Sequence, residues 1–235
     1  MKKLDLRIEQ QVESECAVEC LYSVLRYYGI SSSRKELVRE ASYKSKKWRD
    51  WDYKICRSAL KRGLKATVVT MSTEIFDPTW FKINIDKLIE KLEVELEKVK
   101  NKLKDSKKNI NFHSLSLKIE EISAAITFFK QGGKIEFEPL SIKKIESFID
   151  KNIPVFAPHN STLLQSKSRM LRFKKNDTSG HDWGHVFLII GYDDNQFIVA
   201  DPEKWNRGKH YYEVPKNLLI ESILRRNQNI YVVYK

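Results

Sequence analysis

The sequence lacks the features that would mark a membrane protein or a disulfide-stabilised one. No run approaches the roughly 20 apolar residues that a membrane-spanning helix needs, so we expect no transmembrane segment. Residues 1–7, MKKLDLR, lack the apolar stretch of a secretory signal. Three cysteines in a chain of 235 residues do not make a disulfide framework. These absences predict a cytoplasmic protein with reduced thiols, and secretion by a signal-less route is the alternative.

Motifs for nucleotides and nucleic acids are also missing. The phosphate-binding patterns GxGxxG and GxxxxGK do not occur, and neither does a zinc-finger spacing, an aromatic RNA-binding motif or a basic zipper. The 43 Lys and Arg against 31 Asp and Glu give a net charge of +12, but the lysines are dispersed among glutamates. We therefore expect no cofactor and no nucleic-acid partner. A polyanionic partner or a membrane surface is the alternative explanation of the charge.

The first third of the sequence is predicted to be mainly helical. Apolar residues at helical spacing predict a helix over residues 16–28, which Gly29 ends. Two more helices are expected over residues 34–41 and 53–62. A strand rich in Val and Thr follows over residues 65–71.

Residues 81–131 have a different pattern. An apolar stripe with Lys and Glu between its members predicts an amphipathic helix over residues 85–104, and a second helix is expected over residues 115–130. We interpret 81–131 as a helical hairpin inserted into a single domain that spans residues 1–235. A plain structural insertion is the simplest interpretation, and a hairpin that docks a substrate or a protein partner is the alternative.

The last part of the sequence predicts an antiparallel sheet. One helix is expected over residues 142–151, and a polar loop from about 159 to 182. The expected strands cover residues 134–137, 155–157, 186–192, 197–200, 211–214 and 230–234. Helices followed by an antiparallel sheet are the order of an α+β fold.

Cys16, His185 and Asp201 form a candidate thiol nucleophile with its base and orienting acid. Cys16 opens a predicted helix, and a helix N-terminus and a neighbouring imidazolium both stabilise a thiolate. His185 begins one strand and Asp201 closes the next, and antiparallel neighbours bring such ends together. An aspartate there can fix the imidazole tautomer. The contact with Cys16 requires the fold.

An acyl-transfer reaction also needs donors for the oxyanion. The backbone N–H of Cys16 and the side-chain amide of a glutamine can serve. We prefer Gln10, which lies six residues before Cys16, and Gln11 is a competitor.

Each of these residues has a simpler explanation when it is taken alone. A cysteine on an apolar helix is usually a core residue, as we expect for Cys20 and Cys56. Asp201 before a proline is a common turn signal. His181 and His185 have the i,i+4 spacing of a metal pair, but Gly184 argues against a shared helix face, and we expect no metal.

Three segments together resemble a known family. Residues 10–21 resemble the Q-x5-C-G-x-A-C-L start of the bacteriocin-processing cysteine peptidases, cysteine-peptidase family thirty-nine, which are papain-like. Residues 184–193 (GHVFLIIGYD) and 197–202 (FIVADP) resemble later parts of the same family. The resemblance covers about residues 8–69 and 139–234, and the helical region between them has no counterpart.

The resemblance implies a stand-alone thiol protease with a papain-like fold. Cys16 would be the nucleophile, His185 the general base and acid, Asp201 the orienter and Gln10 the oxyanion donor. The family cuts after a double glycine, often within an ABC exporter, a role that this sequence does not imply because it has no ATPase motif. Ala17 replaces the usual glycine and weakens the case for leader-type specificity. A deamidating or other acyl-transfer enzyme and a non-catalytic peptide-binding module are the alternatives.

The substrate itself is not predicted by the sequence. Subsites are expected in the loop 159–182 and around residues 48–51, with Trp51, Trp183 and Trp205 as candidates to line a cleft or to pack in the core. The basic stretch 167–175 is either solvated surface or a feature that steers an acidic substrate.

Overall fold

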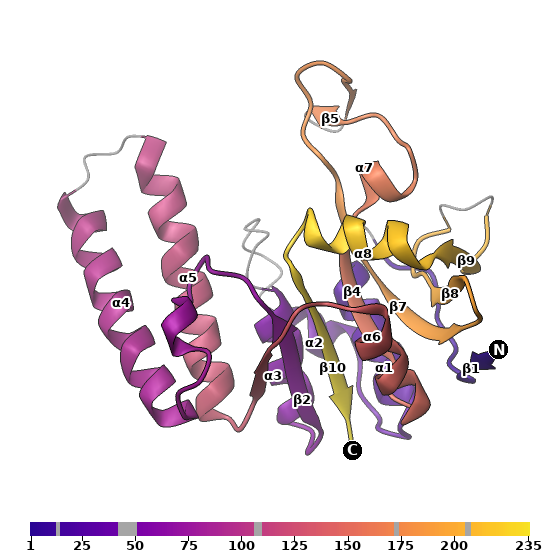
Figure 1. The fold of residues 1–235 in the computed structure, drawn as a ribbon, viewed down its shortest axis with the longest axis horizontal. Helices are drawn as coiled ribbons and strands as arrows, with labels where there is room; N and C mark the ends of the chain where they lie inside the picture. Colours follow the sequence, from indigo (N-terminus) through magenta and orange to yellow (C-terminus); the bar gives the residue numbers. More distant parts are fainter. Residues whose placement is uncertain (13–14, 42–50, 106–109, 172–173, 205–207) are drawn as a thin grey trace.

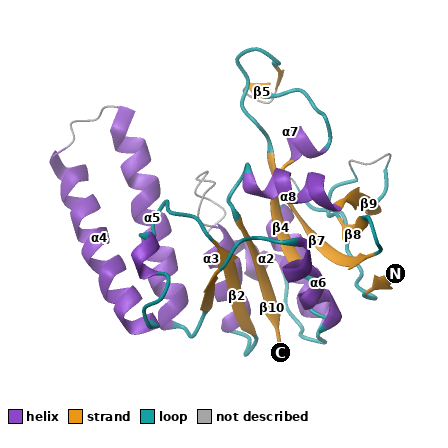
Figure 2. Cartoon of the chain, viewed as in Figure 1, coloured by secondary structure: helices purple, strands orange, loops and turns teal. Residues whose placement is uncertain are grey.

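A large sheet lies at the centre of the molecule, with helices on both of its faces (Figures 1 and 2). The structure is a computed structural model that describes residues 1–12, 15–41, 51–105, 110–171, 174–204 and 208–235. Within these residues, eight strands form the main sheet and two short strands form a separate ribbon. The main-sheet strands are β1 (Lys2–Lys3), β2 (Lys65–Thr70), β3 (Lys134–Phe137), β4 (Val155–Asn160), β7 (Gly184–Tyr192), β8 (Gln196–Ala200), β9 (Tyr211–Pro215) and β10 (Asn229–Tyr234).

The strands follow one another in the order β3-β2-β10-β4-β7-β8-β9, and β1 pairs with the end of β7. Every pair is antiparallel except β2 with β3. Because helices cover both faces, the central strands carry continuous apolar runs rather than alternating, as in VFLII of β7. The predicted α+β fold, with a helical N-terminal part packed on a mostly antiparallel sheet, is confirmed.

The N-terminal helices α1 (Cys16–Tyr27), α2 (Arg34–Glu40) and α3 (Trp51–Leu60) lie on one side of the sheet, where α1 packs on β7 and α3 packs on β2 and β10 (Figure 1). Helices α6 (Ile142–Asp150) and α8 (Lys216–Leu224) cover the other side. Gly29 follows the C-cap residue Tyr28 of α1 and adopts φ +73°, a left-handed conformation that glycine permits at a helix end. None of the helices in the described residues is long and apolar enough to cross a bilayer.

Helices α4 (Ile85–Asp105) and α5 (Ile110–Lys130) pack against each other and stand beside the edge of the sheet that β3 forms (Figure 1). A short 3-10 helix, η1 (Pro78–Trp80), precedes them. The base of the pair belongs to the core, because Phe128 and Phe129 of α5 are buried and their rings contact that of Tyr53 in α3. The outer face of α4 carries the exposed Val94.

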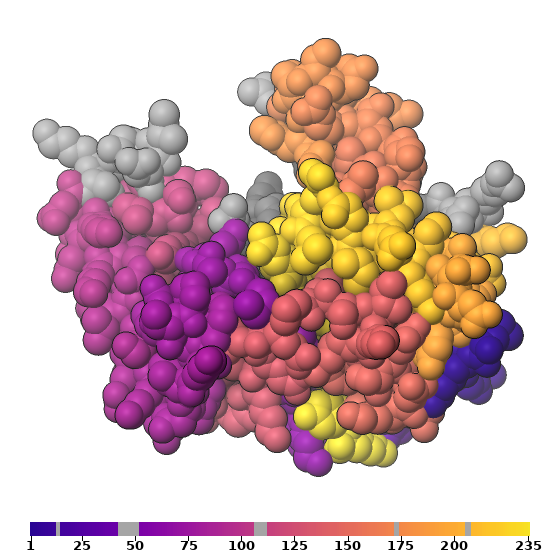
Figure 3. Space-filling model, in the orientation of Figure 1, coloured from indigo at the N-terminus to yellow at the C-terminus, as the bar shows by residue number. Residues whose placement is uncertain are grey.

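The expected loop over residues 159–182 is wrong in part, because it contains regular structure. Strand β4 continues to Asn160, and α7 (Ser161–Leu164) follows, capped by the Asn160 side chain. Strands β5 (Met170–Leu171) and β6 (Lys174–Lys175) then pair as a short ribbon. The space-filling view shows this segment, which we call the arm (residues 161–171 and 174–183), standing out beyond the rest of the molecule (Figure 3). Helix α8 was not predicted, since its apolar residues surround it and leave little periodicity.

The N-terminal segment runs along the sheet before it enters α1. The backbone N–H of Leu4 donates to the carbonyl of Ile190 at 2.7 Å, and that of Gln11 donates to the carbonyl of Pro202 at 2.9 Å. This path carries the chain from the end of β7 to the residues after β8. The segment therefore delivers Cys16 to the same edge of the sheet as His185 and Asp201.

Candidate active site

His185 and Asp201 form a buried pair at one edge of the sheet. His185 is the second residue of β7, and Asp201 directly follows β8. The His185 Nε2 and Asp201 Oδ1 atoms are 2.7 Å apart, with 4% of His185 and 0% of Asp201 exposed to solvent. The antiparallel pairing of β7 with β8 brings the two residues together, as the order of the sequence predicts.

Three groups hold the Asp201 carboxylate. Oδ1 accepts the backbone N–H of Glu203 at 2.8 Å as well as His185, and Oδ2 accepts the hydroxyl of Tyr212 at 2.5 Å. Burial alone would raise the pKa of Asp201, but the charge and hydrogen bond of His185 and the other two donors outweigh it and lower the pKa. The carboxylate is therefore ionised at neutral pH.

His185 is held in its protonated form by the same contacts. Burial favours neutral imidazole, yet the charge of Asp201 and its hydrogen bond, together with a hydrogen bond to Cys16, raise the pKa of His185 to about 10. Because Asp201 occupies Nε2, Nδ1 is the ring nitrogen left for the thiol. The structure thus brings together all three residues that the sequence singles out.

Cys16 begins α1 and is partly exposed, unlike the other two cysteines. Cys20 lies one helical turn later and donates its thiol to the carbonyl of Val186 at 3.7 Å. Burial raises the pKa of the Cys20 and Cys56 thiols well above the ordinary value. The geometry therefore singles out Cys16 as the accessible thiol, with Cys20 and Cys56 in the core.

The two candidate glutamines have different surroundings. Gln10 is exposed, and its Nε2 donates to Glu203 Oε1 at 3.4 Å. Gln11 is partly buried and its backbone is tied to Pro202. Both lie beside the residues that follow Asp201, so the choice between them as oxyanion donor stays a prediction.

A second histidine, His159, lies directly opposite His185. The two residues are cross-strand partners in β4 and β7, with ring centroids 5.5 Å apart. Burial and the charge of His185 lower the pKa of His159 to about 3, so this ring is neutral. His159 Nδ1 lies 3.0 Å from the carbonyl of Ala157, and its Nε2 lies 3.2 Å from the hydroxyl of Ser161. His159 was not predicted as a site residue, because the polar sequence from 159 to 182 predicts a loop there, whereas His159 lies in β4.

The remaining histidine and tryptophan candidates lie in the arm, in α3 or outside the described residues. His181 is exposed and pairs through its backbone with Met170 in the arm. Trp183 is partly buried, and its backbone N–H donates to the Thr162 hydroxyl at 2.8 Å. Trp51 begins α3. The segment 48–50, including Trp48, and Trp205 lie outside the described residues, as does part of the basic stretch 167–175.

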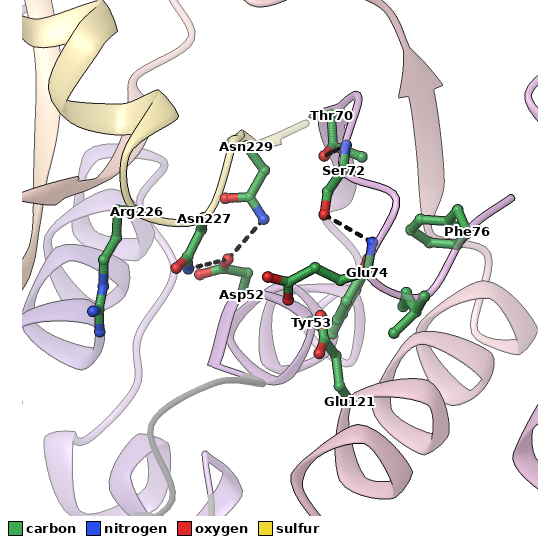
Figure 4. Close-up of a pocket in the computed structure, with 11 residues that line it drawn as sticks. Asp52, Tyr53, Thr70, Ser72, Glu74, Phe76, Glu121, Arg226, Asn227 and Asn229 are labelled. Atoms are coloured by element: carbon green, nitrogen blue, oxygen red, sulfur yellow. Dashed lines mark hydrogen bonds between the residues drawn. The ribbon is translucent and has the colours of Figure 1, made fainter. Parts of the chain in front are cut away.

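A polar cavity of about 100 Å³ opens at the same sheet edge, where β2 ends and β10 begins (Figure 4). The Asp52 carboxylate lies in its wall and accepts the side-chain amides of Asn227 and Asn229 at 3.2 and 2.9 Å. Arg226 also lines this cavity and packs on Gly184, since a Cβ on that glycine would lie 2.3 Å from Arg226 Nε. Arg226 therefore separates the cavity from the residue that precedes His185.

The described residues contain no arrangement of side chains that could form a metal centre. No group of three or more His, Cys, Asp and Glu side chains there is placed to hold an ion. The chemistry that the arrangement can support is that of a thiol beside an imidazolium with a fixed carboxylate.

Comparison with known proteins gives one family. The family model described as Peptidase_C39 like family matches residues 65–229, more than half of the chain. The matched residues include His185 and Asp201 and begin after Cys16 and Gln10. The chain has no significant match among curated proteins.

Similar solved structures include two that span the whole chain. A C39-like protein from Bacillus anthracis is 13% identical, with a TM-score of 0.52, over 100% of this chain and 98% of that one. The peptidase domain of Streptococcus ComA, a bi-functional ABC transporter involved in a quorum-sensing pathway, is 13% identical with a TM-score of 0.43 over the same shares. The first of these likenesses supports the fold.

Proposed function

Because the chain belongs to the Peptidase_C39 like family, we propose that it is a cysteine peptidase that acts through Cys16, His185, Asp201 and Gln10. Its substrate is a peptide or a protein. The observation that carries this proposal is the buried pair of His185 and Asp201, with the partly exposed thiol of Cys16 against the imidazole.

In the first step, the Cys16 sulfur attacks the carbonyl carbon of the scissile peptide bond. Negative charge moves onto the carbonyl oxygen, which the backbone N–H of Cys16 and the side-chain amide of Gln10 stabilise. The His185 imidazolium gives its proton to the leaving amine as the C–N bond breaks. The products of this step are the free amine and a thioester on Cys16.

In the second step, neutral His185 removes a proton from water, and the oxygen attacks the thioester carbonyl. The carboxylic acid leaves and the Cys16 sulfur returns to its starting state beside the imidazolium. Asp201 does not take the proton in either step. It keeps the ring in one orientation and stabilises the imidazolium.

Cleavage of a peptide library tests the proposal. Wild-type protein is expected to release new N-termini, and Cys16→Ala is expected to release none, because it has no nucleophile. Cys56→Ala is the matched control, since this thiol is buried in α3 and should leave cleavage unchanged. Undiminished cleavage by Cys16→Ala would overturn the proposal.

Trapping the acyl-enzyme separates hydrolysis from transfer on the same site. Mass spectrometry of wild-type protein quenched during turnover should show a peptide fragment on Cys16. Water should then be its main acceptor even when a primary amine is added. A product that carries the added amine as the main outcome would instead indicate an acyl-transfer enzyme.

A further inference from the structure

Tyr212 reaches the Asp201 carboxylate from the strand beyond it. The residue lies in β9, where it is the cross-strand partner of Val199 in β8. Its hydroxyl donates to Asp201 Oδ2 at 2.5 Å. The neighbouring Tyr211 points elsewhere, and its hydroxyl accepts the backbone N–H of Ile8 at 3.0 Å.

The contacts of Asp201 divide between its two oxygens. Oδ1 receives His185 and the Glu203 backbone N–H, whereas the hydrogen bond recorded for Oδ2 within the described residues comes from Tyr212. Rotation of the carboxylate about its Cβ–Cγ bond would move both oxygens away from their donors. The Tyr212 donor on the second oxygen therefore adds to the restraint that the two donors on Oδ1 provide.

The phenol is well suited to act as a permanent donor. It is partly buried, and burial together with the charge of Asp201 raises the pKa of Tyr212 far above its ordinary value. The hydroxyl therefore keeps its proton at neutral pH. A tyrosine can donate in this way without adding a second charge to the site.

We propose that Tyr212 is a positioning residue for the reaction, which holds the Asp201 carboxylate in the plane that fixes His185. The inference rests on the proposed peptidase function. It adds a residue that neither the sequence pattern nor the family motif indicates, because Tyr212 is brought to the site by the register of β9.

The other polar groups near Asp201 leave this role to Tyr212. His210 Nδ1 donates to the backbone carbonyl of Asp201 at 2.7 Å, so it holds the main chain rather than the carboxylate. Lys167, at the base of the arm, interacts electrostatically with both Asp201 and Glu203. The Cys20 thiol is buried on the α1 side, and burial raises its pKa so that it stays neutral.

Steady-state kinetics on a peptide that the wild type cleaves tests the inference, with Tyr212→Phe and Tyr211→Phe as a matched pair. Each substitution removes one hydroxyl and keeps the ring. Tyr212→Phe is expected to lower kcat on the order of tenfold with KM within about twofold, and Tyr211→Phe should change neither. The titration midpoint of His185 in NMR spectra should shift in Tyr212→Phe and stay unchanged in Tyr211→Phe.

A double-mutant cycle with Asp201→Asn shows whether the effect passes through the carboxylate. In that background Tyr212→Phe should change kcat by less than about twofold. An equal loss in both backgrounds, or a Tyr212→Phe variant that matches Tyr211→Phe, would overturn the inference.

Alkylation of Cys16 by iodoacetamide keeps this test separate from the proposed function. If the wild-type Cys16 reacts no faster than Cys56, the peptidase proposal itself fails. If the wild-type Cys16 reacts fast and Tyr212→Phe reacts equally fast with an unchanged His185 midpoint, only the positioning role fails. The expected result is fast alkylation in wild type and slower alkylation in Tyr212→Phe.

Discussion

At the scale of single residues, two histidines face each other across β4 and β7 and hold their protons very differently. Both rings are buried, which favours the neutral form. His185 has Asp201 beside it, and its pKa rises to about 10. The hydrogen-bond partners of His159 are neutral, and burial together with the charges of His185 and Arg226 outweighs the charge of Asp201, so its pKa falls to about 3. One proton is thus placed on the ring that faces Cys16.

The low pKa of His159 predicts a loss of stability in acid. Between pH 6.5 and about 3 the ring is neutral in the folded protein and protonated in the unfolded chain. Unfolding therefore takes up a proton, and the free energy of unfolding falls by up to about 1.4 kcal/mol for each pH unit of acidification.

Urea titrations between pH 4 and 6.5 check this expectation. His159→Gln should reduce the slope of unfolding free energy against pH, whatever its effect on stability at neutral pH. His113→Gln is the control, because His113 is exposed on α5. Equal slopes in wild type and His159→Gln would contradict the neutral state of the buried ring.

Asp201→Asn should lower both activity and the pKa of His185. The amide keeps the shape of the carboxylate but removes its charge, which is what raises the pKa of His185 above the value that burial favours. We expect kcat to fall by at least about 100-fold, because the imidazolium loses its support. The NMR titration midpoint of His185 should move from about 10 towards neutral or acidic pH, and a midpoint that stays high would contradict the assigned cause.

At the scale of secondary-structure elements, Gly191 controls how closely β1 approaches β7. A Cβ at this position would lie 2.4 Å from the carbonyl oxygen of Lys2 and 2.9 Å from the Cα of Lys3. Both atoms belong to backbone and cannot move aside separately. At Gly184 the obstructing atoms belong to the flexible Arg226 side chain.

Gly191→Ala should therefore destabilise the protein more than Gly184→Ala. We expect a loss of about 1–3 kcal/mol in the free energy of unfolding for Gly191→Ala, as for other overpacked sites. Chemical denaturation of the two variants side by side measures the difference. A greater loss for Gly184→Ala would show that the β1 contact is not tight.

The paired helices α4 and α5 combine a core-forming base with an outer half that stands away from the sheet (Figure 1). Replacing residues 98–118 by a short Gly/Ser linker keeps buried Leu88, Leu92, Phe128 and Phe129 in place. We expect this variant to fold and to cleave short peptides at the wild-type rate. Deletion of 85–130 should instead prevent folding, since it uncovers Tyr53.

Comparing short peptides with a protein substrate decides between the two interpretations of residues 81–131. Unchanged cleavage of both by the shortened variant supports a structural insertion. Lost cleavage of the protein alone supports a docking role for residues 81–131. A deletion of 85–130 that folds normally would contradict the role of the α5 base in the core.

The sequence predicts those helices and strands that have one apolar face, or that end at a glycine or a capping residue. The α1 and α4 helices and strand β3 follow from apolar spacing and from glycines and caps. The polar sequence of the arm gave no such signal, so α7 and the β5–β6 ribbon were missed. The order of the strands in the sheet could not be predicted either, because no local pattern specifies that β10 lies between β2 and β4.

The candidate site also combines contacts that the local sequence predicts with contacts that depend on which strands are neighbours. The approach of His185 to Asp201 is local, since a hairpin joins their strands, and the sequence predicts it. His159 and Tyr212 lie beside this pair only because of the register of β4 with β7 and of β9 with β8. Their places could not be predicted without knowing which strands are neighbours.

At the scale of the whole molecule, the site combines two parts of the fold. Cys16 comes from the helical layer, and His185, Asp201 and Tyr212 come from the sheet. Helix α1 packs on β7, and this packing joins the thiol to the imidazole. The reactive state of Cys16 should therefore disappear at the same denaturant concentration as the global fold, which alkylation and circular dichroism recorded together can check.

The pH dependence of Cys16 alkylation tests most directly whether His185 activates this thiol. Iodoacetamide labelling followed by peptide mass spectrometry gives separate rates for Cys16, Cys20 and Cys56 from pH 4 to 9. In wild type, Cys16 should react rapidly at pH 6 and at least about tenfold faster than in His185→Gln. Equal Cys16 rates in the two proteins, both rising only near the pKa of about 8.5 of a free thiol, would contradict the account.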